Sequence, residues 1–332
     1  MAGARPERQP DPLDGKPGPG RRRARGQLAR VPHPSRRRPC RSRRVRHPDL
    51  AFLDRRPARS VAPVAGHRPP AGGACVMNRP AVLAGSAAAL AALVFLAPPL
   101  GQSIAQPLSY HDFADKRACF GLPNCLDVVS NVGFVLAGAS GLVFLAGAAG
   151  RRAFVDAREV RPYAVFFLAV ILIGFASAWY HLAPDNARLA WDRAAMALAF
   201  MAWFAALFAE RAGVKAGLML LAPLCAAGLG AVFYWVWSEA QGAGDLRPWL
   251  LIQLLPMVLV PLLLWLYPPR YSHEHDMLAV VGLYLVALLL DLGDRAVFAL
   301  TNGAVGGHAL KHAAAALAAW RVARHLRRRR PA

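Results

Sequence analysis

The sequence predicts an all-α polytopic membrane protein, a bundle of seven transmembrane helices with an additional N-terminal hydrophobic helix. Of its 332 residues, 56% are hydrophobic and only 18% are charged. From residue 80 onward, apolar stretches of about 17 to 25 residues alternate with short polar breaks, and this is the length that a helix needs to cross the hydrocarbon core. Lys and Arg gather in alternate breaks, as they do in the loops on one side of a membrane.

Residues 1–76 are rich in Arg and Pro and lack helical or strand periodicity, so we expect a disordered tail. Residues 1–74 hold 19 of the 40 Lys and Arg residues behind the formal net charge of +21. Such a tail is compatible with binding nucleic acid or an anionic membrane surface. We favour a simpler interpretation, in which Met77 is the true start and no nucleic-acid partner is expected.

The apolar stretches define eight spans. The first lies in segment 77–105 and suits either a cleaved signal peptide or a membrane anchor, because Arg79 precedes it and small residues follow it. The other seven form a domain over residues 110–326, and residues 327–332 form a basic cytoplasmic tail. The spans are expected at residues 80–100, 125–149, 162–182, 193–209, 215–238, 248–267, 276–300 and 304–322.

Loop charge predicts the orientation. The breaks "RRAFVDAREVRP", "ERAGVK" and "PPRY" and the tail "RHLRRRR" carry most of the Lys and Arg, whereas "LAPDNAR", "EAQGAGDLR" and "TNG" carry fewer. The positive-inside rule then places the start of the seven-helix core outside and the C-terminus in the cytoplasm. We expect a multi-pass protein of the bacterial inner membrane.

Three histidines in or beside the spans stand out, because ionisable groups within a membrane are costly and usually functional. His308 and His312, in "GGHALKH", are four residues apart and share one helix face. His181 ends another span on the outer side, at the depth expected for His308. Three neutral histidines with one open coordination position are the ligand set of a catalytic zinc ion. The alternatives are hydrogen-bonded core histidines, a haem pair or, for His181, a histidine that faces water.

A polar segment precedes the first core span and reads "YHDFADKRACFGLPNCLDVVSN". It carries Asp112, Asp115, Asn124 and Asp127, hard oxygen ligands that suit calcium at a membrane surface. The alternative is a solvated loop in which Asn124 and Asp127 cap the following helix.

Two other polar sets receive no chemical role from their spacing. Asp291, Asp294 and Arg295, near the outer end of the sixth core span, are expected to form an internal ion pair that packs helices. Cys119 and Cys125 lack metal-type spacing, although an oxidising compartment would allow them to pair.

These residues together resemble the alkaline ceramidase family, which belongs to a superfamily of seven-helix membrane hydrolases that includes the adiponectin and progestin receptors. The matching pieces are "SAWYH", the Asp of "WDR" eleven residues later and "HALKH" in the last span, in the same order. The resemblance covers residues 110–326.

The resemblance implies a role for each matching residue. His181, His308 and His312 would bind zinc, and Ser177 would help to hold the bound water or the oxyanion. Asp192 would serve the metal site through proton transfer or orientation.

The resemblance also implies a calcium site at Asp112, Asp115 and Asn124. Here the sequence departs from the family, because Phe113 stands where Trp is usual, Arg117 replaces a polar ligand and Asn124 replaces Glu. Fewer negative charges imply weaker calcium binding.

The expected function is zinc-dependent hydrolysis of a lipid amide, ceramide-like or another N-acyl lipid, which enters from the bilayer and yields a fatty acid and an amine. A membrane lipid is therefore the expected partner. The rival interpretations are a receptor-like protein with a structural metal and a transporter in which "GGH" and "DLGD" belong to a broken helix. Three histidines without a fourth protein ligand favour an open, catalytic position.

Overall fold

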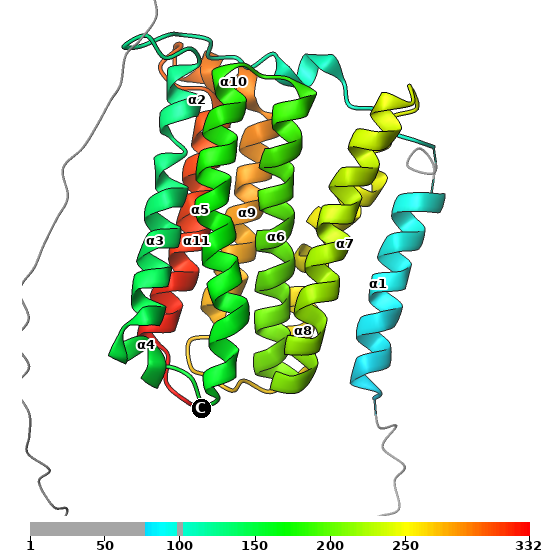
Figure 1. Ribbon diagram of the computed structural model, residues 1–332, viewed down its shortest axis with the longest axis vertical. Helices are drawn as coiled ribbons and strands as arrows, with labels where there is room; N and C mark the ends of the chain where they lie inside the picture. Colours follow the sequence, from blue (N-terminus) through cyan, green and yellow to red (C-terminus); the bar gives the residue numbers. More distant parts are fainter. Residues whose placement is uncertain (1–76, 98–101) are drawn as a thin grey trace, which may run out of the picture. The chain divides into compact units, whose positions relative to one another are not determined.

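The computed structural model describes residues 77–97 and 102–332, so the expectations for residues 1–76 lie outside the described part of the chain. Within the described residues, seven helices are long and apolar enough to cross a membrane. The secondary structure of these residues is helical, apart from two isolated bridges, which confirms the predicted all-α polytopic bundle (Figure 1).

The helices follow the predicted spans, and most of their ends differ from the prediction by a few residues. The long helices are α1 (Arg79–Leu96), α3 (Val132–Ala146), α5 (Val160–Leu182), α6 (Asn186–Arg211), α7 (Val214–Ala240), α8 (Arg247–Leu266), α9 (His275–Leu292) and α11 (Gly307–Arg328). The short helices are α2 (Cys125–Val129), α4 (Ala148–Arg152) and α10 (Asp294–Leu300), with 3₁₀ turns at Leu108–His111 and Ala157–Glu159.

Two predicted spans are interrupted. Span 125–149 divides into α2, α3 and α4, and span 276–300 breaks at Gly293 into α9 and α10. Glycine is a poor helix former, and it stands at two of these breaks, Gly147 and Gly293. Residues Cys125–Ala146 still form one segment long and apolar enough to cross a membrane, whereas the continuous helix predicted over residues 276–300 was wrong, because α9 ends at Leu292.

Helix α11 is not among the seven apolar spans, although it has 22 residues. Its histidines, lysine and arginines lower its mean hydropathy. It nevertheless belongs to the bundle, because it packs along its length against α9 and α3. With the seven apolar helices, α11 completes the predicted set of eight long helices.

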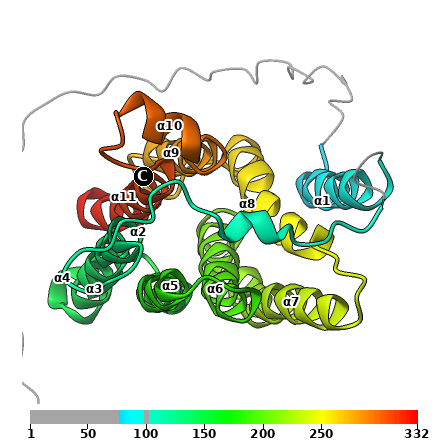
Figure 2. The same cartoon turned by 90° about the horizontal axis from the view of Figure 1, so that it is seen from above.

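Seen from above, α11 lies at the edge of the bundle between α3 and α9, and α8 lies on the side of α1 and α7 (Figure 2). Helix α11 contacts α3 and α9, α5 lies between α3 and α6, and α8 contacts α1, α6, α7 and α9. We call the end that carries α2 and α10 the α10 end and the opposite end, with α4 and the C-terminus, the C-terminal end (Figure 1).

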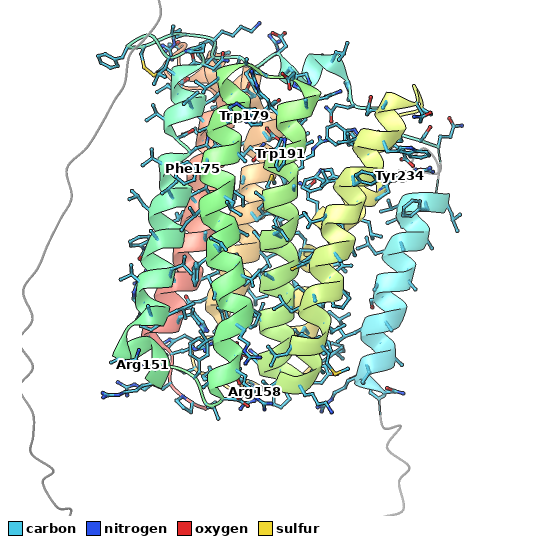
Figure 3. All side chains as sticks on the ribbon, viewed as in Figure 1. Arg151, Arg158, Phe175, Trp179, Trp191 and Tyr234 are labelled. Atoms are coloured by element: carbon cyan, nitrogen blue, oxygen red, sulfur yellow. A yellow bond between two sulfur atoms is a disulfide. The ribbon has the colours of Figure 1, made fainter. Side chains whose placement is uncertain are left out.

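The flanks of the bundle are apolar and exposed, as expected for surfaces that face lipid. Phe175 and Trp191 remain 63% and 65% exposed. Trp179 and Trp191 lie toward the α10 end, whereas Arg151 and Arg158 lie at the C-terminal end (Figure 3). This distribution has the interfacial aromatic residues and the one-sided arginines of membrane proteins.

The basic tail predicted at residues 327–332 begins within α11 and packs against the bundle at Arg329. Helix α11 continues to Arg328, and the side chain of Arg329 is buried in an ion pair with Glu210 of α6. Its guanidinium also lies 3.8 Å from the ring centroid of Tyr271. A buried carboxylate requires a cation, and Arg329 supplies it from the chain end.

Candidate metal centre

Helices α5 and α11 bring the three predicted histidines together. His181 lies in the last turn of α5, and His308 and His312 lie in the first turns of α11. All three side chains are buried, and each offers a nitrogen within 4.8 Å of the others. Within the described residues, this is the one group of three or more potential ligands that is close enough to hold a metal ion.

The spacing of the nitrogens fits one metal ion. The Nε2 atoms of His181 and His308 are 3.2 Å apart, and the three ring centroids are separated by 4.7, 4.8 and 5.1 Å. Two nitrogens bound to a tetrahedral zinc ion at 2.0–2.1 Å would be roughly 3.3 Å apart. The His181–His308 distance therefore agrees with two ligands of one metal ion, and a nitrogen of His312 lies within 4.8 Å of both.

Hydrogen bonds on the far side of two rings orient these nitrogens. His308 Nδ1 lies 2.7 Å from Asp291 Oδ1, and His312 Nδ1 lies 2.8 Å from Ser130 Oγ. Because Nδ1 is occupied in both rings, Nε2 is directed toward the centre of the group, as in metal sites whose histidines are held by outer partners. His181 Nδ1 is buried and has no hydrogen-bond partner.

The predicted internal ion pair forms at Asp291, between α9 and α11, but its cation is Lys311 and not Arg295. Asp291 contacts His308 and, at 3.1 Å, Lys311 Nζ. The side chain of Arg295 is 69% exposed and pairs with Asp112. Arg295 takes no part in this pair, because α9 ends at Leu292 and Arg295 lies in the separate helix α10.

The start of α11 is fixed by Asp294. Its Oδ1 accepts a hydrogen bond from the backbone N–H of His308 at 2.9 Å, and its Oδ2 accepts one from Ala114 at 2.8 Å. A Cβ atom on Gly307 would lie 2.3 Å from the carbonyl oxygen of Leu290, so this position requires glycine. The "GGH" sequence thus allows α11 to approach α9 closely and sets the position of His308.

Of the two predicted catalytic residues, Ser177 lies beside His312, and Asp192 lines the cavity that His312 also lines. Ser177 is one turn before His181, and its Oγ is 3.5 Å from His312 Nε2. Asp192 of α6 is buried, and one of its carboxylate oxygens has no hydrogen-bond partner. Both residues line the same cavity as His312.

This cavity has a volume of about 420 Å³ and contains both polar and apolar walls. Its polar residues, among them Ser177, Asp192 and Lys311, lie with the histidines toward the α10 end. Along α6 the lining continues from Asp192 to Trp203, roughly 16 Å at 1.5 Å per residue. The cavity therefore has the shape and polarity of an amphiphile, with a polar end at the histidines and an apolar extension into the bundle.

The segment before α2 covers the histidines. The ring of Phe113 is 4.7 Å from that of His181 and 4.3 Å from that of His308, centroid to centroid, and Phe113 is buried. Asn124 Nδ2 donates to the backbone oxygen of His181 at 2.8 Å. This segment closes the metal centre on the side of the α10 end.

The residues expected to bind calcium have protein partners instead. Asp112 pairs with Lys116 and Arg295, and Asp115 is held by Arg117 at 2.6 Å. The hydrogen bond from Arg117 lowers the pKa of the Asp115 carboxyl. Calcium would have to displace these ion pairs, so the contacts give the calcium prediction no support.

Asn124 stands at the N-cap of α2 with φ of 46°, but its side chain does not cap the helix. Asp127 is buried, and neither of its carboxylate oxygens has a hydrogen-bond partner. The helix-capping alternative is therefore wrong for the Asn124 side chain. Close by, Cys119 and Cys125 are joined by a disulfide.

Sequence reasoning missed the residues that orient the histidines. Ser130 was overlooked, Asp291 was given only a packing role, and Lys311 and Phe113 received no role in the metal centre. A polar residue within an apolar span was the available signal for Ser130 and Lys311. No comparable signal existed for Phe113, because an aromatic residue is ordinary at a membrane interface.

The fold and the site define a class: a polytopic helical membrane protein with a buried group of three histidines at one end of a cavity. Comparisons with family models, with curated proteins and with solved structures find no match.

Proposed function

We propose that this protein is a zinc-dependent hydrolase of the membrane, which cleaves a lipid amide into a fatty acid and an amine. The observation that carries the proposal is the convergence of three imidazoles on one point, beside Ser177 and Asp192, at the polar end of a cavity with an apolar extension. The resemblance of "SAWYH", "WDR" and "HALKH" to alkaline ceramidases points to the same chemistry.

His181, His308 and His312 would hold the zinc ion, with Asp291 and Ser130 fixing two of the rings. A zinc ion with three histidine ligands supplies a Lewis acid and lowers the pKa of a water molecule toward 7. The apolar extension would hold the acyl chain and so place the amide carbonyl at the histidines.

Ser177 and Asp192 would act on the substrate and the water. The Ser177 hydroxyl would donate a hydrogen bond to the oxygen on which negative charge develops. The unpartnered oxygen of Asp192 would accept a proton from the attacking water and transfer it to the leaving nitrogen, as a general base and then a general acid. Both steps use residues that already line the cavity.

We further propose that the protein is a multi-pass protein of a bacterial inner membrane, with the α10 end facing the periplasm. The arginines at the C-terminal end and the disulfide near the α10 end support this orientation. A reporter inserted near Gly242 should then behave as periplasmic, and one fused after Ala332 as cytoplasmic. The reverse pattern would place the metal centre at the cytoplasmic face.

The main test measures zinc content and release of fatty acid from labelled lipid amides by the purified protein. His312→Ala should lose both, because two remaining ligands hold the ion weakly. Ser177→Ala and Asp192→Asn should keep most of the zinc but lose turnover, by about 10²- to 10⁴-fold for Asp192→Asn.

The same measurements separate the rival functions. A receptor-like protein with a structural metal would contain zinc but release no fatty acid from any lipid amide. A transporter would show neither zinc nor hydrolysis. If the His312→Ala protein kept a full equivalent of zinc and normal hydrolysis, the proposed ligand set would be wrong.

A further inference from the structure

The guanidinium of Arg193 is a buried cation that lacks an anionic partner. Arg193 follows Asp192 on α6 and is 5% exposed. One terminal nitrogen donates to Gln106 Oε1 at 2.6 Å, and the other has no hydrogen-bond partner. Within the described residues, no carboxylate forms an ion pair with it. An arginine stays charged in a protein, and a buried charge is costly unless it is paired.

Three aromatic rings contact this guanidinium, but they carry no negative charge that would neutralise it. Its central carbon lies 4.3 Å from the ring centroid of Trp235, 5.5 Å from that of Trp249 and 5.7 Å from that of Tyr110. Cation–π contacts stabilise a cation over a ring and leave the N–H groups free to bind an anion. The site therefore fixes the position of Arg193 and leaves one of its N–H groups unused.

Arg193 lines the same cavity as Ser177, Asp192 and His312. The other cation of this cavity, Lys311, is paired with Asp291 at 3.1 Å. Among the described residues, Arg193 is thus the cation of the cavity wall that forms no ion pair, although the carboxylate of the neighbouring Asp192 interacts with it at longer range. It lies at the polar end, next in sequence to the proposed general base, where the head group of an acyl lipid would be.

We propose that Arg193 binds a carboxylate on the head group of the substrate, so that the substrate is an N-acyl amino acid rather than a neutral ceramide. This inference rests on the proposed function. An open donor group on a cation that forms no ion pair suits a monoanion, whereas a phosphate dianion would keep a second charge unpaired. In the reaction, water adds its oxygen to the acyl carbon, the C–N bond breaks and the nitrogen takes a proton, which gives a fatty acid and a free amino acid.

The test compares N-palmitoylglycine with its methyl ester, which has the same chain and amide but no negative charge. Binding is measured first, with the slow Asp192→Asn protein, and hydrolysis is then measured with the otherwise unchanged protein. A charge-assisted hydrogen bond to a buried group should favour the acid over the ester by about 10- to 100-fold. Arg193→Gln should abolish this preference, and Arg193→Lys should retain part of it.

Arg188→Gln is the matched control, since Arg188 lies on the same helix, five residues earlier, and pairs with Asp185 outside the cavity. It should leave the preference unchanged. Thermal unfolding of each variant shows whether Arg193 is needed for folding, and Arg193→Lys keeps the test open if Arg193→Gln does not fold.

Other results would contradict either the role of Arg193 or the proposed function. Equal binding of acid and ester, or an equal loss of both in Arg193→Gln, would make Arg193 a packing residue and overturn the inference, while hydrolysis of lipid amides would still support the proposed function. Preference for an N-acyl phosphoethanolamine over N-palmitoylglycine would overturn the assignment to a carboxylate. Arg193-dependent binding of the acid without hydrolysis of any amide would support the carboxylate site and contradict the proposed function.

Discussion

Helices α9 and α11 are joined by two similar sets, one toward each end, and each set has an aspartate of α9 with a histidine and a basic side chain of α11. The set at the α10 end consists of Asp291, His308 and Lys311, in which the carboxylate lies 2.7 Å from the imidazole and 3.1 Å from the ammonium. The set at the C-terminal end consists of an aspartate of α9 and an arginine and a histidine of α11, namely Asp276, Arg321 and His325.

The two sets differ in what the histidine meets on its other side. On its other side, His308 Nε2 lies 3.2 Å from Nε2 of a second imidazole, that of His181, and His312 belongs to the same group. His325 lies 3.5 Å from Asp276 and belongs to no such group within the described residues. Asp291 and Lys311 also line the cavity.

This difference shows which feature indicates function. An aspartate that pairs with a base and a histidine across two helices serves packing equally well at both ends. Three similar imidazoles that face one another gain little from mutual contact, so their convergence supports the proposed metal ion between them. The metal centre is therefore defined by His181 and the cavity, and the Asp–His contact alone would not have identified it.

The largest expected effect comes from removing the histidine of each set in turn. His308→Ala should lower zinc affinity and turnover by more than the roughly 100-fold seen when an outer partner of a metal ligand is removed. His325→Ala should keep both per folded molecule. Metal analysis and hydrolysis assays on the two purified variants check this. Equal zinc loss in both would remove the distinction between the two ends.

A loss of stability without loss of function is expected at the C-terminal end. Arg329→Ala leaves Glu210 as a buried carboxylate without its ion-pair partner, and such a change costs about 3–5 kcal/mol. Unfolding in detergent, monitored by circular dichroism, should show the destabilisation. Zinc bound per folded molecule should stay at its normal value, and a fall in zinc stoichiometry would link this end to the metal centre.

Replacing the aspartate of the set at the α10 end should have an intermediate effect. Asp291→Asn replaces the carboxylate that orients His308, so zinc affinity should fall by about 10- to 100-fold. Asp276→Asn is the matched control on the same helix pair and should leave zinc affinity unchanged. Competition with a metal chelator measures both. If both variants lose affinity equally, the effect is one of α9–α11 packing.

The smallest effect is expected for Ser130→Ala, which removes one hydrogen bond between neutral groups at His312 Nδ1. Such a bond contributes about 0.5–1.5 kcal/mol, so zinc affinity should fall by tenfold or less. The same chelator competition measures it. A loss as large as that of His308→Ala would show that Ser130 is itself close to the metal.

Much of the fold and part of the metal centre follow from the sequence. Apolar length predicts the spans, because a helix that satisfies its own backbone hydrogen bonds is the unit that crosses a bilayer. The i, i+4 spacing of His308 and His312 places them on one face whatever surrounds them. Loop charge placed His181 at the same end, and the structure brings the three together.

Other features were decided only by the tertiary structure. The partners of Asp291, Arg329 and Arg193 lie on other helices or in the segment before α2, and hydropathy leaves the rotation of each helix about its axis open. The contact of Asp294, whose carboxylate accepts a hydrogen bond from the first turn of α11, joins residues that are distant along the helices. Which charged group is paired, and which faces a cavity, depends on side chains that meet only after the helices pack, because the low polarity of the bundle makes every buried charge depend on its nearest partner.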